Sequence, residues 1–276
     1  MENKNIKFAF WGTPSVASDT LQILIDNGLT PSVVITNPDR KQGRGLELTQ
    51  SPVKVLALKH GIQVLTPEKI DDDFINNFSK LNIDLSIVVA YGSILPENII
   101  SMPKFGTLNI HYSLLPKYRG ASPVESALLN GDEETGVTIQ KMIRKLDAGD
   151  IVATESLSIN QTITKDELRN ELINLGANLL IKILPDYIEN KINTVQQDES
   201  QATHCGKIKK EDGLIDLNDD TNINYNKYRA YSGWPGIHFF QDGKRIKVTS
   251  AHLEDGKFVI DKVIPEGKKE TTYKKI

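Results

Sequence analysis

The stretch from Ile6 to Gly28, IKFAFWGTPSVASDTLQILIDNG, decides the fold. Its apolar beginning, Ile6–Trp11, predicts a buried strand. The Thr13-Pro14 pair that follows supplies an N-cap oxygen and a preset first helical residue, and Gly28 is a typical helix end. A buried strand that leads directly into a capped helix is the repeating element of a parallel sheet.

The same start signal recurs further along the chain. Ser-Pro pairs open predicted helices over 51–61 and 122–131, and each of these ends at a glycine. A longer helix is predicted from Thr164, where Glu167 completes a capping box. Further predicted strands cover 32–36, 85–90, 107–111 and 137–142. The alternation predicts an α/β fold, with a Rossmann-like, mostly parallel sheet and helices on both faces.

The chain changes character after residue 189. Residues 190–204 are polar and lack periodicity, which is typical of a linker. We therefore assign 1–189 to a first domain, 190–204 to the linker and 205–276 to a small C-terminal domain. Short β-rich runs separated by Asp-Gly turns predict an OB-like β-barrel for this second domain.

Composition sets limits on the compartment and on the partners. The single cysteine, Cys205, forms no internal disulfide, and the polar start over 1–6 does not resemble a secretory leader, so we expect a cytoplasmic protein. The longest apolar runs, such as 85–91, are far shorter than the ~20 residues that span a bilayer, so no membrane contact is expected.

The charge balance differs between the two parts of the chain. The net charge of −3 argues weakly against a polyanionic partner. From Cys205 onward, however, 14 basic residues face 11 acidic ones, whereas the rest of the chain has 19 against 25. A basic C-terminal domain that contacts phosphates and an ordinary solvated surface explain this contrast equally well.

Polar side chains suited to catalysis gather between residues 109 and 150. Asn109 and His111 are two residues apart on a predicted strand, so both point to one face of the sheet. Polar groups at the carboxyl end of such a strand lie where open α/β sheets bind ligands, and they can hold a developing oxyanion. Asp147 follows the next strand and offers a route for a proton. From the residues alone, a structural histidine and a turn carboxylate remain the more ordinary interpretations.

Three segments together resemble the signature of the folate-dependent formyltransferase family. They are the tripeptide Asn109–His111, the loop over 113–120 and the run over 146–150, LDAGD. The resemblance implies that Asn109, His111 and Asp147 are catalytic and that 10-formyltetrahydrofolate is the formyl donor. We expect no metal, because the single cysteine and the scattered His204, His238 and His252 offer no tight ligand spacing.

The resemblance also implies contacts with the folate in two places. Residues 89–96 resemble the strand and turn of the family's pterin pocket, and the loop after the Asn-His strand matches a second part of its folate site. The implied folate-binding residues are Tyr91, Gly92, Ser93, Leu95, Ser113, Leu114, Leu115 and Pro116.

Segments outside the catalytic residues indicate the acceptor. Phe10–Pro14 resembles the opening strand of those family members that formylate methionyl-tRNA, and 38–45 resembles the loop with which they approach the acceptor arm. Lys207–Gly213 and Trp234–Gly236 resemble the start of their C-terminal domain, which looks abridged here. The implied tRNA-binding residues are Arg40, Lys41, Arg44, Lys207, Lys209 and Lys210.

The resemblance thus implies formyl transfer to the α-amino group of methionyl initiator tRNA, for translation initiation. Its implied partners are the tRNA and the folate, with no obligate protein partner. Two alternatives stay open: an amino-sugar N-formyltransferase that acts on a nucleotide-linked sugar, and a catalytically silent RNA-binding protein on the same scaffold. The basic loop over 40–45 argues against the first alternative, and the intact catalytic residues argue against the second.

Overall fold

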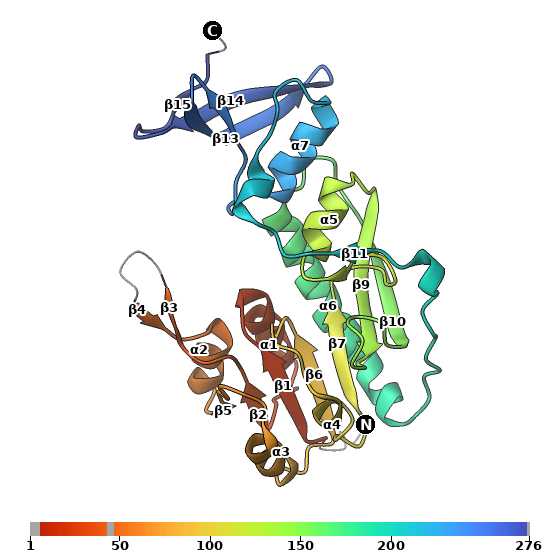
Figure 1. The fold of residues 1–276 in the computed structure, drawn as a ribbon. Coiled ribbons are helices and arrows are strands. Elements are labelled where there is room, and N and C mark those ends of the chain that lie inside the picture. Colours follow the sequence, from red (N-terminus) through yellow and green to blue (C-terminus); the bar gives the residue numbers. More distant parts are fainter. Residues whose placement is uncertain (1–5, 43–46, 275–276) are drawn as a thin grey trace. The chain divides into compact units, whose positions relative to one another are not determined.

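The computed structural model describes residues 6–42 and 47–274. Within them the main sheet has seven strands in the order β10-β9-β7-β6-β1-β2-β5 (Figure 1). The five strands from β5 to β7 are parallel, and β9 runs antiparallel to β7. The bounds are β1 (Phe8–Gly12), β2 (Val33–Ile35), β5 (Gln63–Leu65), β6 (Leu85–Val89), β7 (Thr107–His111), β9 (Glu134–Lys141) and β10 (Ile151–Ser158). The predicted mostly parallel sheet is confirmed, and the predicted strand ends over 32–142 differ from these by at most three residues.

Helices pack against both faces of this sheet. On one face, Trp11 of β1 and Val33 of β2 form a core cluster with Phe78 of α3 and Ile99 of α4. The helices are α1 (Ser15–Asp26), α2 (Pro52–Lys59), α3 (Asp72–Ser79), α4 (Glu97–Ile100), α5 (Pro123–Leu129), α6 (Lys165–Ile188) and α7 (Thr221–Ala230).

The opposite face is covered by α1 and by the later turns of α6. A Cβ atom at Gly12 would lie 2.6 Å from the Cβ of Ala17 in α1, and one at Gly176 of α6 would lie 2.9 Å from the side chain of Ile110. Side chains alternate along a strand, so Asn109 and His111 point away from this face. They lie on the side of the sheet that α3 and α4 cover.

The predicted helix starts are correct, but their predicted caps are correct only in part. Ser51 accepts a hydrogen bond from the Lys54 amide at 3.1 Å, as expected for an N-cap. Thr13 does not cap α1, because its hydroxyl donates to the Tyr91 carbonyl and the N-cap position is Pro14. The Ser122 hydroxyl likewise donates to the Gly206 carbonyl. Both hydroxyl groups bind a loop that is distant in sequence, which propensity cannot indicate.

The chain forms two compact units that are interleaved along the sequence. The first contains 1–117, 136–155 and 172–202, and the second contains 118–135, 156–171 and 203–276. The second unit therefore includes α5 and the first turns of α6 besides the C-terminal residues. The domain boundaries at 189 and 205 stay a prediction.

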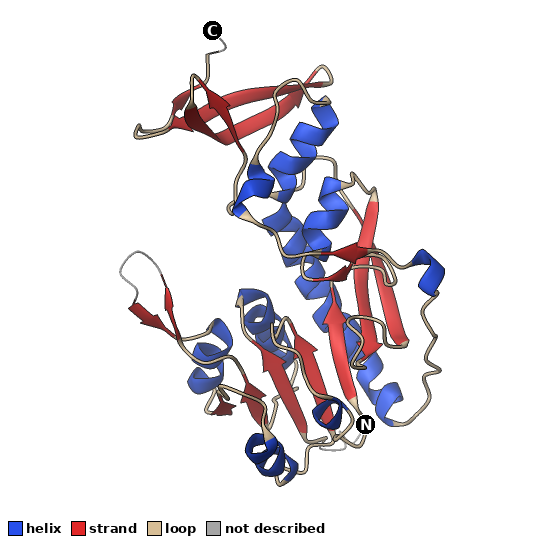
Figure 2. Ribbon diagram, viewed as in Figure 1, coloured by secondary structure: helices blue, strands red, loops and turns tan. Residues whose placement is uncertain are grey.

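The C-terminal residues form an antiparallel sheet, which confirms the predicted β-rich region (Figure 2). Asp242-Gly243 and Asp255-Gly256 have positive φ at all four residues, as two-residue type I′ hairpin turns require. In the described residues the strands pair in the order β12-β13-β14-β15, with no pairing of β12 to β15 that would close the predicted barrel. Their bounds are β12 (His238–Gln241), β13 (Lys244–Glu254), β14 (Lys257–Pro265) and β15 (Thr271–Thr272).

Two short strand pairs complete the described structure. The hairpin β3 (Arg40–Gln42) and β4 (Glu47–Thr49) is antiparallel, and β8 (Arg119–Gly120) pairs in parallel with β11 (His204–Cys205). In the part of the chain that is described, no helix combines the length and the apolar character that a membrane span needs.

A buried lysine binds the start of α6 to the C-terminal segment within the second unit. The Lys165 ammonium is 6% exposed and donates to the carbonyls of Ser232 at 2.6 Å and Trp234 at 3.1 Å. Because burial disfavours its charge, the pKa of Lys165 is lowered. We expect Lys165→Met to reduce the free energy of unfolding by about 1–3 kcal/mol, because both carbonyls lose their donor.

Urea unfolding of the full chain measures this effect. The matched control is Lys182→Met at an exposed position of the same helix, which we expect to change the free energy of unfolding by less than about 0.5 kcal/mol. Equal stability of the two variants would show that the Lys165 hydrogen bonds contribute nothing net.

Candidate active site

The three residues predicted to be catalytic lie together in the first unit. Asn109 is level with Val88 of β6, so it belongs to the face covered by α3 and α4. Asn109 and His111 are 9% and 6% exposed. The Asn109 Nδ2 atom lies 3.5 Å from Oδ1 of Asp147, and the His111 Nδ1 atom lies 3.7 Å from the same oxygen. An amide, an imidazole and a carboxylate thus converge on one point.

Asp147 reaches this point from a tightly constrained loop after β9. Its own φ is +49°, in the left-handed region that few residues other than glycine adopt. At Gly149 a Cβ atom would lie 1.6 Å from the Lys141 carbonyl oxygen, so only glycine fits. The LDAGD motif therefore requires its glycine for steric reasons.

Two buried glutamines that the sequence did not indicate also hold this loop. Gln140 of β9 donates to Oδ1 of Asp147 at 3.0 Å and accepts from the Gly149 amide at 3.2 Å. Gln197 donates to the carbonyls of Asp147 at 2.9 Å and Gly149 at 2.7 Å. Neither position carried a signal in the sequence, because β9 also holds Thr135, Thr138 and Lys141, and Gln197 stands in a polar run.

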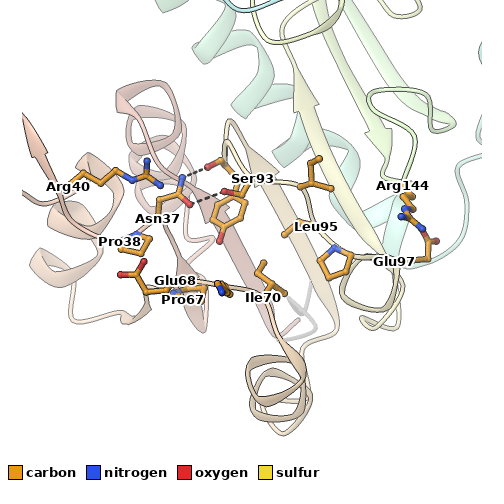
Figure 3. Close-up of a pocket in the computed structure, with 14 residues that line it drawn as sticks. Asn37, Pro38, Arg40, Pro67, Glu68, Ile70, Ser93, Leu95, Glu97 and Arg144 are labelled. Atoms are coloured by element: carbon orange, nitrogen blue, oxygen red, sulfur yellow. Dashed lines mark hydrogen bonds between the residues drawn. The ribbon is translucent and has the colours of Figure 1, made fainter.

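A cavity of about 540 Å³ lies next to the turn that follows β6 (Figure 3). Loops after the parallel strands β2, β5 and β6 line it, which is where open α/β sheets bind ligands. Of the residues predicted to bind folate, Tyr91, Ser93 and Leu95 line this cavity, and Gly92 lies between them in the chain. The other lining residues are Asn37, Pro38, Arg40, Pro67, Glu68, Lys69, Ile70, Ile94, Pro96, Glu97 and Arg144.

Asn37 shapes the wall of this cavity, although the sequence did not single it out. Its Nδ2 atom donates to the Tyr91 carbonyl at 2.9 Å, and its Oδ1 atom accepts from the Ser93 hydroxyl at 3.2 Å (Figure 3). The turn that carries Tyr91 and Ser93 has positive φ at Ala90 and Gly92. Asn37 thus satisfies the polar groups of a turn that departs from extended geometry.

The aromatic ring of Tyr91 is backed by the core. It lies edge-on to Trp11, with ring centroids 5.3 Å apart. Burial raises the pKa of Tyr91 to about 12, because the phenolate form would lose its hydration. The hydroxyl is protonated at neutral pH, as in an ordinary tyrosine, and can donate a hydrogen bond.

The second predicted folate segment, 113–116, lies outside the lining of this cavity. Ser113 is fully buried, and its hydroxyl donates to the Lys117 carbonyl at 2.6 Å. Thr138 of β9 accepts from the Leu115 amide and donates to the Ser113 carbonyl, which fixes the loop on the sheet. Contacts of Ser113, Leu114, Leu115 and Pro116 with folate stay a prediction.

The predicted tRNA-binding residues are exposed wherever they are described. Arg40 and Lys41 lie on β3, and the neighbouring Asp39 pairs with Lys54 of α2 at 2.7 Å. Arg44 lies outside the described residues. In the second unit, the exposed residues are Lys207, Lys209 and Lys210. No three His, Cys, Asp or Glu side chains within 6–42 and 47–274 are grouped as metal ligands.

Comparisons with known proteins show the family of the chain. Residues 4–184 match the formyl transferase family, and residues 207–268 match the formyl transferase C-terminal domain. The methionyl-tRNA formyltransferase of Sulfurihydrogenibium sp. is 40% identical over 250 residues, which cover 90% of this chain and 80% of the relative.

Two solved structures share the fold at low identity. A methionyl-tRNA formyltransferase from Clostridium thermocellum matches with a TM-score of 0.62 at 16% identity, over 94% of this chain and 98% of that one. An N-formyltransferase from Helicobacter canadensis, in complex with folinic acid and dTDP-3-aminofucose, matches with a TM-score of 0.66 at 20% identity, over 92% and 95%. With two family matches and a relative 40% identical over most of its length, the chain belongs to the formyl transferase family.

Proposed function

We propose that the chain transfers the formyl group of 10-formyltetrahydrofolate to the α-amino group of methionine carried on initiator tRNA. The observation that carries the proposal is the convergence of Asn109 and His111 on one carboxylate oxygen of Asp147. A relative named for this reaction, 40% identical over 90% of the chain, supports the choice of acceptor. Initiation of translation takes place in the cytoplasm, which is where we place the protein.

The reaction begins with the neutral α-amine, whose pKa near 8 leaves a usable unprotonated fraction at neutral pH. Its nitrogen attacks the formyl carbon, and the carbonyl oxygen becomes an oxyanion. The Asn109 amide has two N–H groups, so it can donate to this oxyanion while its other N–H faces Asp147. His111 supplies a second donor.

The remaining steps concern protons. The attacking amine must lose one proton, which a bound water passes to Asp147. The bond between the formyl carbon and N10 then breaks, and N10 regains a proton as tetrahydrofolate leaves. Formyl-methionyl-tRNA and tetrahydrofolate are the products, so atoms and charges balance without an oxidant or a metal.

We assign the folate to the cavity beside Tyr91. A volume of about 540 Å³ falls within the range of ~300–1,000 Å³ that is usual for pockets of small ligands. The side chains of Leu95 and Ile70 offer apolar contacts to a pterin ring, and the Tyr91 hydroxyl remains a donor. The bound folinic acid of the Helicobacter canadensis relative supports a formylated folate as the donor.

An acceptor competition tests the proposal against the amino-sugar alternative. Donor labelled in its formyl group is offered to the chain together with methionyl-tRNA and a nucleotide-linked amino sugar at equal concentrations. We expect the label in the tRNA fraction. Label found mainly in the sugar would replace the proposed acceptor by the alternative one.

The basic loop after β2 should act on tRNA affinity and leave the chemistry unchanged. We expect the double change Lys41→Ala and Arg44→Ala, which leaves Arg40 of the folate cavity in place, to raise KM for tRNA and to reduce the logarithmic salt slope by roughly 0.9 for each phosphate that the loop no longer neutralises. The control is Lys80→Ala, an exposed lysine after α3. Steady-state formylation at several salt concentrations measures both parameters, and an unchanged slope would exclude phosphate binding by this loop.

A further inference from the structure

We propose that Gln197 and Gln140 are positioning residues that hold Asp147 in its reactive geometry. The inference rests on the proposed function, because it assigns Asp147 a role in formyl transfer. Gln197 belongs to the segment 190–204, which has the polar composition of a linker. Its hydrogen bonds show that part of this segment is built into the catalytic site.

The burial of Gln197 is unusual for its surroundings. It is 5% exposed, whereas its neighbours Gln196 and Asp198 are exposed. A buried amide requires hydrogen-bond partners, and the Gln197 Nε2 atom finds two, the carbonyls of Asp147 and Gly149. A single side chain thus binds both ends of the three-residue turn that presents the carboxylate.

The segment on either side of Gln197 is bound alongside the same loop. Val195 and Ile151 form an antiparallel bridge with two backbone hydrogen bonds, at 2.8 and 2.9 Å. On the other side of Gln197, Glu199 pairs with Lys145 at 2.7 Å. Residues 195–199, with Gln197 in their middle, therefore lie beside residues 145–151. The Val195–Ile151 bridge holds the backbone two residues before Gln197 beside the loop, and the Gln197 amide reaches the turn from there.

Gln140 acts on the carboxylate itself. It faces Asn109 across the β7–β9 pair, and its donor is nearer to Oδ1 of Asp147 (3.0 Å) than the Asn109 amide (3.5 Å). When Asn109 turns toward a substrate oxygen, Gln140 still holds the carboxylate in place. Gln197 therefore fixes the backbone of Asp147, and Gln140 fixes its side chain.

The main test compares the same substitution at two glutamines of one segment. Gln197→Met keeps the side-chain length but removes both donors. Gln201→Met is the control. Gln201 is exposed, and its side chain donates a local hydrogen bond, to Asp198 three residues earlier. Because a displacement of about 1 Å costs up to ~100-fold in rate, we expect kcat of Gln197→Met to fall ten- to a hundredfold while KM for both substrates stays within about twofold.

Hydrogen exchange of the full chain supplies a readout that does not depend on activity. In Gln197→Met the amides of 146–150 should exchange faster than in the wild type, whereas in Gln201→Met they should not. A kcat within twofold of the wild type, or unchanged exchange in this loop, would overturn the inference. If Gln197→Met does not fold, Gln140→Met gives the same two readouts, since it removes the donor to Oδ1.

Failure of the proposed function would look different. In that case the wild type and Gln201→Met would both leave methionyl-tRNA without a formyl group. The exchange measurement would still decide whether Gln197 holds the loop, because it needs no acceptor.

Discussion

Substitution of His111 by alanine, or of Asp147 by asparagine, lowers kcat for methionyl-tRNA by more than tenfold and by up to about 1,000-fold. In the proposed mechanism, His111 donates to an oxyanion that forms only as the reaction proceeds, and Asp147 is needed when the amine proton leaves. Interactions made only in the transition state affect kcat and not ground-state binding. Folate affinity, measured by quenching of the protein's tryptophan fluorescence, to which Trp11 beside Tyr91 contributes, should therefore change little.

The control for this pair is His60→Ala, because His60 is an exposed histidine of the same unit after α2. We expect it to retain wild-type turnover. If either His111→Ala or Asp147→Asn also kept wild-type turnover, that residue would have no part in the chemistry.

Substitution of Gly149 by alanine should have the second largest effect. The new methyl group would lie 1.6 Å from the Lys141 carbonyl oxygen, so the loop must move and carry Asp147 with it. We expect kcat to fall by about 100-fold from the displaced carboxylate. Strain of this kind should also lower the free energy of unfolding by about 1–3 kcal/mol.

Gly206→Ala provides the matched control, since a Cβ atom there meets nothing within 4 Å. We compare the turnover and the urea unfolding of Gly149→Ala with those of Gly206→Ala. A decrease seen only in Gly149→Ala arises from the steric clash at that position and not from the replacement of a glycine as such. Wild-type turnover in Gly149→Ala would show that the loop can shift without moving the carboxylate.

Local patterns predicted the sheet because strands and helix starts depend on near neighbours in sequence. Ser51 is both the predicted cap and the observed one. Thr13 and Ser122 have the same local signal, yet their hydroxyl groups bind carbonyls far along the chain. Such tertiary hydrogen bonds can replace a local cap, and nothing in the neighbouring residues reports them.

Helix α7 was missed for a related reason. Its sequence, TNINYNKYRA, is rich in Asn and Tyr, which are weak helix formers. Interactions from outside the helix stabilise it: Asp220 caps the Asn222 amide, the Asn224 amide donates to the Asp216 carbonyl, and α7 packs on α5. The first two interactions are local, but the packing of α7 on α5 joins segments about 90 residues apart, and a window of sequence does not contain that information.

The candidate site was predictable only in part. Asn109 and His111 follow from the period of a strand, but the approach of Asp147 depends on a loop that closes across 38 residues. Only the resemblance to a family indicated that Asp147 belongs to the same site as Asn109 and His111. Gln197 could not be found in this way, because a buried glutamine and an exposed one look alike in a polar run.

The transfer of the formyl carbon itself tests the central claim most directly. Donor carrying ¹³C in its formyl group is mixed with methionyl-tRNA and excess enzyme for one turnover, and the amino acid released from the tRNA is identified by mass spectrometry. We expect N-formylmethionine that carries the label on its α-nitrogen with the wild type, and a much slower appearance of it with His111→Ala. Unformylated methionine from the wild-type reaction, with the donor intact or merely hydrolysed, would contradict the account.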